Sequence, residues 1–299
     1  MKTIGIVGFG FVGTAVFEGM KHAFNIMVYD KAKGCIKYTK NGDTSNFSCE
    51  NGIDRVVTDT DGPIFVCVPT PMNPDGSANT TIVEGVVKAI SESAERLGKH
   101  GIVVAIKSTV VPGTTLKLNG SFNNIHVCFN PEFLTERNAA NDFKNQDRII
   151  IGGPHEGTAA LKQMYETAYP NVPVTKTSST IAELVKYVTN CFLATKVSFA
   201  NEMQQICGKL DVDYDKVVEY ATKDKRLGGS HWSVPGPDGK KGFSGSCFPK
   251  DLNALMKLAE HLGVECSTIK GAWETNLRVR PDKDWEQLKG RAVTDSSEP

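Results

Sequence analysis

A glycine pattern near the N-terminus, Gly8-Phe9-Gly10-Phe11-Val12-Gly13, restricts the possible folds more than any other feature of the sequence. It follows a β-branched run at residues 3–7. Apolar residues at helical spacing come next over 11–24, before a second strand-like run at 26–29. Glycines in this pattern make a tight turn, let the backbone approach a pyrophosphate, and let helix and strand pack closely. The context predicts a strand-helix-strand unit that binds a dinucleotide at the helix N-terminus.

Asp30, at the end of the second strand-like run, predicts which dinucleotide is bound. A carboxylate at this position accepts hydrogen bonds from the ribose hydroxyls and repels a 2′-phosphate, so we expect NAD. Lys31 and Lys33 leave NADP as an alternative. Another alternative is that the glycines only make a turn and Asp30 only ends a strand. The predicted cofactor-binding residues of this region are Gly8, Gly10, Phe11, Val12, Gly13, Asp30 and Lys31.

Strands that alternate with helices continue through the first half of the chain. Short apolar runs at 64–68, 101–106, 125–129 and 148–151 accompany a helical pattern at 81–97, where Thr81 and Glu84 fit a capping box. This alternation predicts an α/β fold with a Rossmann-type, doubly wound parallel sheet over residues 1–177.

The pattern becomes helical after residue 177. We expect helices over 180–210, 215–221 and 249–262, with a Gly- and Pro-rich loop at 228–246. Residues 178–280 are therefore predicted to form an all-helical central domain. The long helix is apolar over much of its length and predicts a homodimer interface. The polar residues 281–299 are predicted to be a C-terminal tail.

The composition excludes several classes of protein. The 299 residues include 34 basic and 34 acidic side chains, a balance that does not favour nucleic-acid binding. The 8 cysteines form no C-x-x-C pair, which argues against a metal site and favours reduced thiols in the cytoplasm. Residues 3–17 resemble a signal peptide but lack a cleavage site, and no apolar run is long enough to span a membrane. We expect a soluble protein without a membrane partner.

Cys247 stands out among the cysteines because it comes just before Pro249, a favourable first residue of a helix. A helix N-terminus and the nearby Lys250 favour the thiolate and raise its nucleophilicity. No other cysteine is expected in such surroundings. Those on apparent strands and helices are interpreted as small buried apolar residues.

Two further groups of polar residues are candidates for a site. Lys186 and Asn190 are four residues apart on the predicted long helix, and together they can stabilise an oxygen that gains negative charge. The alternative is a solvated lysine beside an ordinary asparagine. Glu132 and Glu136 follow one strand and residues 107–109 follow another, so all these groups are expected to line one crevice at the carboxyl ends of the strands. Either glutamate could instead favour a helix dipole.

Six stretches match a known family in order, and the chain resembles the UDP-glucose/GDP-mannose dehydrogenase family over residues 3–280. The stretches are residues 8–13, 67–71 with 75–77, 107–110, 130–134, 183–187 with Asn190, and 245–251. The last one, Gly245-Ser246-Cys247-Phe248-Pro249-Lys250-Asp251, is highly specific.

The resemblance implies an NAD-dependent enzyme that oxidises the C6 alcohol of UDP-glucose to a carboxylate in two steps. The intermediate aldehyde can lose a second hydride only after a nucleophile has made its carbon tetrahedral. Cys247 can do this by forming a thiohemiacetal, which is oxidised to a thioester and hydrolysed. By similarity, Lys186 and Asn190 stabilise oxyanions, Asp251 assists proton exchange, and Thr109 with Glu132 positions water.

The family pattern also implies binding residues. Pro69, Thr70, Ser108, Thr109 and Glu136 are expected at the cofactor. The residues expected at the nucleotide sugar are Glu132, Phe133, Leu134, Lys186, Asn190, Arg226, His231, Trp232, Gly242 and Cys247, with Arg226 reaching the site of a neighbouring subunit. No metal is expected.

The chain also departs from the family pattern. Members usually continue into a third, nucleotide-binding-like domain, and we expect a short form in which residues 284–293 resemble a C-terminal segment of the family. The choice among UDP-glucose, UDP-N-acetylhexosamine and GDP-mannose therefore stays open. Ser244 stands where the family tends to have glycine.

Two other interpretations compete with this one. A β-hydroxyacid dehydrogenase joins the same kinds of domain and also uses a lysine and an asparagine one helical turn apart, but it oxidises once and needs no thiol. A catalytically silent protein that binds nucleotide sugar or NAD is the other alternative. The combination of Lys186, Asn190, Cys247 and Asp251 argues against both.

Overall fold

The computed structural model describes residues 2–33, 35–40, 43–48 and 52–295. The chain divides into two compact units. Unit 1 comprises Met1–Thr70 and Thr80–Lys186, and unit 2 comprises Pro71–Asn79 and Tyr187–Pro299. The predicted boundary at residue 177 differs from this division, because the start of the long helix belongs to unit 1 and residues 71–79 belong to unit 2.

Unit 1 contains one mixed sheet, which among the described residues has nine strands in the order β4-β3-β2-β1-β5-β6-β7-β8-β9. The neighbouring pairs are parallel except β2 with β3, β3 with β4, and β7 with β8. The central strands fall where the apolar runs predicted them, while the β3–β4 hairpin was not predicted. The strands are β1 (Thr3–Val7), β2 (Asn25–Asp30), β3 (Cys35–Lys40), β4 (Asp43–Ser48), β5 (Ile64–Val66), β6 (Ile102–Ile106), β7 (Ile125–Phe129), β8 (Ile149–Gly152) and β9 (Val174–Thr177).

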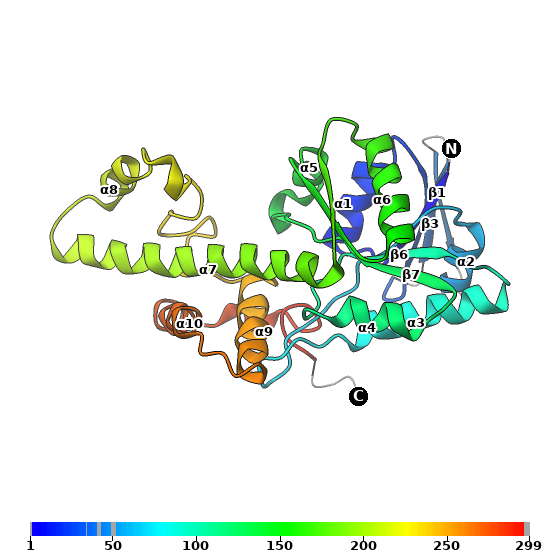
Figure 1. Cartoon of the computed structure of the whole chain (residues 1–299). Coiled ribbons are helices and arrows are strands. Elements are labelled where there is room, and N and C mark those ends of the chain that lie inside the picture. The colour runs from blue at the N-terminus through cyan, green and yellow to red at the C-terminus, as the bar shows by residue number, and fades with distance from the viewer. Residues whose placement is uncertain (1, 34, 41–42, 49–51, 296–299) are drawn as a thin grey trace. The chain divides into compact units, whose positions relative to one another are not determined.

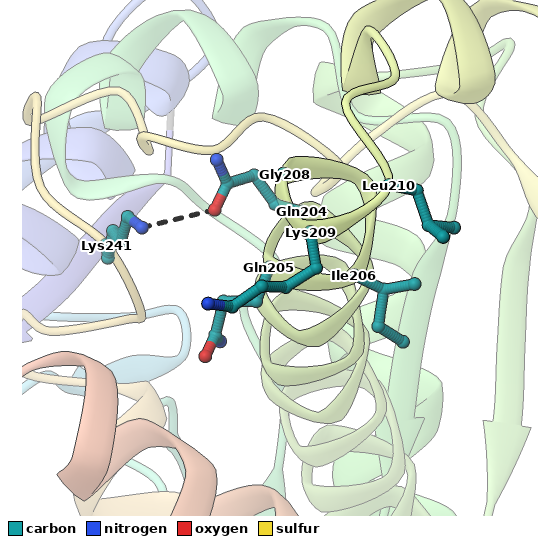
Figure 2. A pocket seen from close by; sticks show the side chains of 7 residues that line it. All are labelled: Gln204, Gln205, Ile206, Gly208, Lys209, Leu210 and Lys241. Atoms are coloured by element: carbon teal, nitrogen blue, oxygen red, sulfur yellow. Dashed lines mark hydrogen bonds between the residues drawn. The ribbon is translucent and has the colours of Figure 1, made fainter.

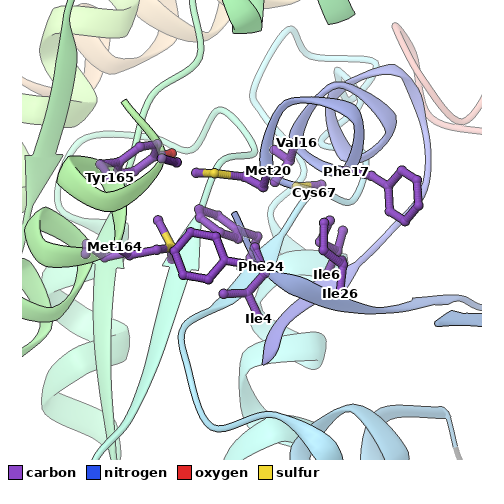
Figure 3. Packing of buried hydrophobic residues seen from close by; sticks show 14 of the residues in the cluster. Ile4, Ile6, Val16, Phe17, Met20, Phe24, Ile26, Cys67, Met164 and Tyr165 are labelled. Carbon is purple, nitrogen blue, oxygen red and sulfur yellow. The ribbon is translucent and has the colours of Figure 1, made fainter. Parts of the chain in front are cut away.

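Helices cover both faces of this sheet (Figure 1), which confirms the Rossmann-type fold class. On one face lie α1 (Phe11–Met20), α5 (Ala139–Lys144) and α6 (His155–Ala168), which bury the cluster shown in Figure 3 against strand residues such as Ile4 and Ile6. On the other lie α2 (Gly52–Asp59), α3 (Thr81–Arg96) and α4 (Thr114–Ser121). Burial of apolar surface on both faces is the main stabilising contribution.

The start of α3 differs from the predicted capping box. Thr80, not Thr81, is the N-cap residue, and its side chain accepts no cap hydrogen bond from the backbone. Its Oγ1 instead donates to Oε1 of Glu84 at 2.7 Å. The glutamate therefore binds the side chain of the N-cap threonine.

Helices make up most of the regular structure of unit 2. The long α7 (Ser179–Lys209) begins in unit 1 and continues into unit 2, and it is followed by α8 (Tyr214–Ala221), α9 (Phe248–His261) and α10 (Ser267–Val279). The first three match the predicted helices within two residues. The buried residues Tyr187, Cys191 and Ala194 of α7 pack against Phe243 and Leu252 in the core of this unit. Within the described parts of the chain, no helix is both long enough and apolar enough to cross a bilayer.

The prediction of a tail after residue 280 was wrong for residues up to 294. Trp285, in the short 3₁₀ helix Asp284–Gln287, is only 1% exposed, and its ring centroid lies 5.3 Å from that of Trp273. The Met72 N–H donates to the carbonyl of Ala292, and the Thr294 N–H donates to the carbonyl of Met72, both at 2.9 Å. One buried aromatic side chain and these backbone hydrogen bonds outweigh the polar composition of the segment.

Candidate active site

The glycine loop of unit 1 has the geometry that its pattern predicts. Gly8 has φ of 94°, and a Cβ there would lie 2.6 Å from the carbonyl oxygen of Cys67. A Cβ on Gly13 would lie 2.1 Å from the carbonyl oxygen of Gly8, so strand and helix approach too closely for any side chain. A Cβ on Gly10 would meet nothing within 4 Å, which leaves open space at the N-terminus of α1. The loop therefore fits a pyrophosphate beside the free N–H groups of the helix.

Asp30 is fixed beside this loop by backbone hydrogen bonds. Its Oδ2 accepts from the N–H of Phe9 at 2.6 Å, and its Oδ1 accepts from the N–H of Lys33 at 2.9 Å. The Lys33 ammonium donates to the carbonyl of Phe9 at 2.7 Å, while Lys31 is exposed. The carboxylate is thus held at the end of β2, where the ribose of a bound dinucleotide is expected.

The other residues predicted at the cofactor follow β5, β6 and β7. Pro69 is exposed and Thr70 is buried after β5, while Ser108 and Thr109 are buried after β6. The Ser108 hydroxyl donates to the carbonyl of Val68 at 2.6 Å, which joins the two segments. Glu136 is exposed on a short 3₁₀ helix, Glu136–Asn138. All of these residues except Glu136 lie at the carboxyl ends of adjacent strands of unit 1, which is where the crevice was predicted.

A buried ion pair joins Lys186 of α7 to Glu132, which follows β7. The ammonium donates to Oε1 of Glu132 at 2.8 Å and to its carbonyl oxygen at 2.6 Å, and the two side chains are 3% and 5% exposed. Oε2 of Glu132 accepts from the Leu134 N–H at 2.7 Å. Burial acts to raise the pKa of Glu132, but the Lys186 charge and these hydrogen bonds hold it below its usual value.

The ion pair decides between the two interpretations of Lys186, because it shows the lysine to be buried and paired within unit 1. Lys186 is not the solvated lysine of the alternative interpretation, and Glu132 binds the lysine rather than a helix N-terminus. The ring of Phe133, with its centroid 5.8 Å from the Lys186 ammonium, lies beside the pair. A charged, desolvated ammonium held in one position suits the binding of an oxygen that gains negative charge.

Lys107, directly after β6, was expected in the crevice without a role of its own, and the structure shows it to be a second buried lysine. Its ammonium donates to Oδ1 of Asn130 at 2.9 Å, and the same oxygen accepts from the Tyr165 hydroxyl at 2.5 Å. Burial lowers the pKa of Lys107 to about 8. The motif at 107–109 marked its position, but its partner Asn130, after β7, is too distant in sequence for any spacing to reveal the bond.

In unit 2, Cys247 is the N-cap residue of α9 and is partly exposed. The helix begins at Phe248, so Pro249 is its second residue rather than its first. One part of the surroundings expected for Cys247 alone is shared, because Cys266 is the partly exposed N-cap residue of α10. The position at a helix N-terminus therefore does not by itself distinguish Cys247.

The buried cysteines fit the interpretation of small apolar residues. Cys67, Cys128, Cys191 and Cys207 are all buried. Burial raises the pKa of the Cys67 and Cys128 thiols to about 12, which suppresses the reactive thiolate. Among these four and the two at helix N-termini, Cys247 and Cys266 are the partly exposed cysteines.

A cluster on α7 and α9 does distinguish the surroundings of Cys247. Asp251, which is 1% exposed in the first turn of α9, accepts from the Asn190 side-chain amide at 2.6 Å. The other carboxylate oxygen forms an ion pair with Lys250. Asn190 is thus a buried, fixed amide rather than an ordinary surface asparagine. The structure brings Glu132 and Lys186 together in unit 1, and Asn190 and Asp251 together in unit 2, while one shared crevice stays a prediction.

The residues predicted to bind substrate between α8 and α9 have mixed surroundings. Arg226 is exposed and pairs with Asp224. His231 is half-buried with φ of 66°, and the Trp232 indole donates to the carbonyl of Gly228 at 2.9 Å. Gly242 has φ of 70°, and a Cβ there would lie 2.4 Å from Oδ1 of Asn276. Their roles toward a substrate stay predictions.

The sequence models of one protein family match most of the chain. The NAD binding domain of the UDP-glucose/GDP-mannose dehydrogenase family matches residues 2–169, and its central domain matches residues 180–278. The chain belongs to the UDP-glucose/GDP-mannose dehydrogenase family. This membership confirms the resemblance, and the match to the family's NAD binding domain confirms NAD as the predicted cofactor.

Two relatives within this family show how much of this chain, and how much of each relative, the similarity covers. The chain is 32% identical to UDP-glucose 6-dehydrogenase TuaD and 38% identical to UDP-glucose 6-dehydrogenase YwqF, both from Bacillus subtilis (strain 168). These matches cover 94% and 71% of this chain, but 64% and 48% of the relatives. The chain thus spans less than two thirds of the length of either relative.

Two solved structures are similar to this chain, one from the same family and one from another class of dehydrogenase. A UDP-glucose dehydrogenase from the archaeon Pyrobaculum islandicum superposes with a TM-score of 0.80 at 30% identity, over 93% of this chain and 68% of that one. A 3-hydroxyisobutyrate dehydrogenase from Mycobacterium tuberculosis gives 0.70 at 16% identity, over 95% of both chains. The second similarity is one of fold alone. It shows that the fold itself does not distinguish the two classes of dehydrogenase.

Proposed function

We propose that this chain is an NAD-dependent nucleotide-sugar dehydrogenase that oxidises the C6 alcohol of UDP-glucose to the carboxylate of UDP-glucuronate. The observation that carries the proposal is the partly exposed Cys247 next to the buried Asn190–Asp251–Lys250 cluster, in a chain with the dinucleotide-binding glycine loop. A single oxidation, as in a β-hydroxyacid dehydrogenase, needs no thiol, and a silent binder needs no buried Lys186 pair.

Each step is assigned to residues of this chain. The glycine loop and Asp30 would hold NAD, which would supply the hydride acceptor for each oxidation. In the first oxidation, the Lys186 ammonium and the Asn190 amide stabilise the developing alkoxide, and the alcohol gives its proton to a water molecule that exchanges protons with Asp251. The product is an aldehyde whose carbon must become tetrahedral before it can be oxidised again.

Cys247 then links the two oxidations. Its thiolate adds to the aldehyde carbon, which forms a C–S bond and leaves an oxyanion for Lys186 and Asn190 to stabilise. Loss of the second hydride gives a thioester. Water held by Glu132 and Thr109 attacks the thioester carbon, the C–S bond breaks, and the carboxylate is released with the thiolate restored. Each sugar thus loses four electrons and gains one oxygen from water.

A panel of nucleotide sugars tests the activity and the choice of substrate. UDP-glucose, UDP-N-acetylglucosamine and GDP-mannose are each incubated with the full chain and NAD, and NADH is followed by absorbance. We expect UDP-glucose to have the highest kcat/KM. NADH formation from none of the three would refute the proposed function, and a preference for another sugar would change the substrate but not the reaction.

Asp30→Ala tests the assignment of the cofactor. Loss of hydrogen bonds between a charged group and the ribose should raise the KM for NAD by about tenfold to a hundredfold. The KM for the nucleotide sugar should change little. Asp147→Ala, which removes an exposed carboxylate paired with Arg148, is the matched control. An equal KM for NAD in wild type and Asp30→Ala would refute the ribose assignment.

We further propose that α7 forms a two-fold interface between two copies of the chain. Val188, Phe192, Phe199 and Ile206 are 59%, 66%, 46% and 49% exposed, and their spacing places them on one face of the helix. An exposed apolar stripe of this length is typical of a protein interface.

Sedimentation velocity of a charged variant tests the dimer. Wild type should sediment as a dimer, and Phe192→Asp/Ile206→Asp should sediment as a monomer because buried carboxylates would lack partners. Leu116→Asp on α4, which changes a residue that is 63% exposed, should remain dimeric. A monomeric wild type at micromolar concentration would refute the interface.

A further inference from the structure

Residues 236–246 form the loop that leads to Cys247, and two glycines with positive φ lie near its end. Gly242 and Gly245 have φ of 70° and 79°, a region that only glycine enters without strain. These two glycines flank Phe243 and Ser244. We call residues 236–246 the approach loop. Backbone hydrogen bonds within it join Gly236 to Lys240 and Gly239 to Gly236, and residues after Lys240 are in contact with other elements.

The anchor of the backbone is α10. Oδ1 of Asn276 accepts from the N–H of Phe243 at 2.7 Å, and its amide donates to the carbonyl of Phe243 at 3.1 Å. Arg280, directly after α10, donates to the carbonyl of Lys241 at 3.2 Å. The side chain of Lys241 also donates to Gln204 of α7 at 3.1 Å (Figure 2). These bonds hold the loop at Lys241 and Phe243.

Beyond Phe243, Ser244 is in contact with Asp284. The Ser244 hydroxyl donates to Oδ1 of Asp284 at 2.5 Å. Arg280, whose side chain is 3% exposed, donates to both carboxylate oxygens of Asp284, at 2.9 and 2.6 Å, and to Asp238 at 2.6 Å. Hydrogen bonds from Arg280 keep the pKa of Asp284 well below its usual value. The carboxylate is therefore ionised at neutral pH, and its bond with Ser244 is charge-assisted.

We propose that Asp284 is a positioning residue that, through the Ser244 hydroxyl, holds residues 244–247 in the conformation that presents Cys247 to the sugar aldehyde. The proposal rests on the proposed function of Cys247. It also gives a role to two features that the sequence left unexplained: the serine where the family tends to have glycine, and the packed segment after residue 280.

Ser244→Ala is the main test, because it removes one hydroxyl and leaves the pairs of Arg280 intact. We expect kcat to fall by about tenfold, as for loss of a charge-assisted hydrogen bond, with an unchanged KM for NAD. Iodoacetamide should modify Cys247 faster in the variant, since a released loop exposes a thiol that is only partly accessible in wild type. Peptide mass spectrometry measures this rate relative to that of Cys266, the partly exposed reference in the same chain. The ratio should rise by about threefold or more, while the melting temperature stays within about 3 °C.

Two further variants separate positioning from a general structural effect. Ser244→Thr keeps the hydroxyl and should restore both kcat and the alkylation ratio. Asp284→Asn removes the charge that strengthens the bond with Ser244 and also weakens the pair with Arg280, so it should raise the alkylation ratio too and lower stability as well. Adding Ser244→Ala to Asp284→Asn should change the alkylation ratio by less than Ser244→Ala does alone, because the two residues act through one contact. Lys257→Ala, which breaks an exposed pair with Glu260, should match wild type.

The outcomes distinguish this proposal from the proposed function. An alkylation ratio that does not rise in Ser244→Ala, or a Ser244→Thr variant as impaired as Ser244→Ala, would overturn the positioning role. The alkylation needs no substrate. A wild type that forms no NADH would therefore refute the enzyme assignment, while the ratio would still test the contact between Ser244 and Asp284.

Discussion

Cys247→Ser should leave the first oxidation in place and stop the second. A serine hydroxyl ionises far less readily than a thiol at neutral pH, so the variant lacks the nucleophile that makes the aldehyde carbon tetrahedral. We expect a burst of NADH from the first oxidation, after which NADH formation from the second oxidation is slower than in wild type on the order of a thousandfold or more, as for loss of other covalent nucleophiles. A hydrazide reagent should trap the sugar aldehyde from the variant but not from wild type.

The control for this variant is Cys266→Ser, because Cys266 is also partly exposed at the start of a helix. Its NADH rate and yield should equal those of wild type. The affinity of Cys247→Ser for NAD should be unchanged, since the glycine loop and Asp30 belong to unit 1. A Cys247→Ser variant with wild-type rate and NADH yield would exclude the covalent mechanism.

Lys186→Met should damage both catalysis and stability. Removal of a donor that stabilises an oxyanion should lower kcat by about a hundredfold or more. The same change leaves Glu132 buried without its ion-pair partner, which should reduce the free energy of unfolding by about 3–5 kcal/mol. Urea denaturation and steady-state kinetics measure the two effects separately.

The effect on stability has a definite pH dependence. In wild type the pKa of Glu132 is lowered, so its stabilising contribution is present above its unfolded value and is lost as the pH falls through the folded value. In Lys186→Met burial raises that pKa instead, so the variant should become more stable relative to wild type as the pH falls toward 4.

The double variant Lys186→Met/Glu132→Gln separates the two roles of the lysine. It removes the unpaired carboxylate and should recover most of the lost stability, but not the lost activity. Lys162→Met, which breaks the exposed pair with Glu166 on α6, should change the free energy of unfolding by less than about 1 kcal/mol. Recovery of kcat in the double variant would show that Lys186 acts only through the ion pair and does not contact the substrate.

Local patterns in the sequence were sufficient for the central elements of the fold. The glycine loop, the central strands and the long α7 follow from steric limits at glycine and from hydrophobic periodicity, both of which act over a few residues. The β3–β4 hairpin was not predicted because its strands at 35–40 and 43–48 are polar and lack a continuous apolar run. The packing of the segment after residue 280 was not predicted because its composition is polar, whereas burial of the single Trp285 side chain holds it in place.

The sequence predicted which residues belong to the candidate site but not which of them pair with each other. Lys186, Asn190, Glu132 and Asp251 were all identified from motifs, whereas the pairs Lys186–Glu132 and Asn190–Asp251 join residues 54 and 61 positions apart. Such pairs depend on how the elements pack, and the spacing of residues along one element does not encode this. Ser244 shows the same limit, since its partner Asp284 lies in a segment that was predicted to be a tail.

The number of NADH molecules formed per sugar tests the central claim most directly. A limiting, known amount of UDP-glucose, or of the best substrate in the panel, is exhausted by the full chain with excess NAD. The account predicts two NADH for each sugar consumed, and a carboxylate as the product. One NADH for each sugar, with the aldehyde as the product, would contradict it.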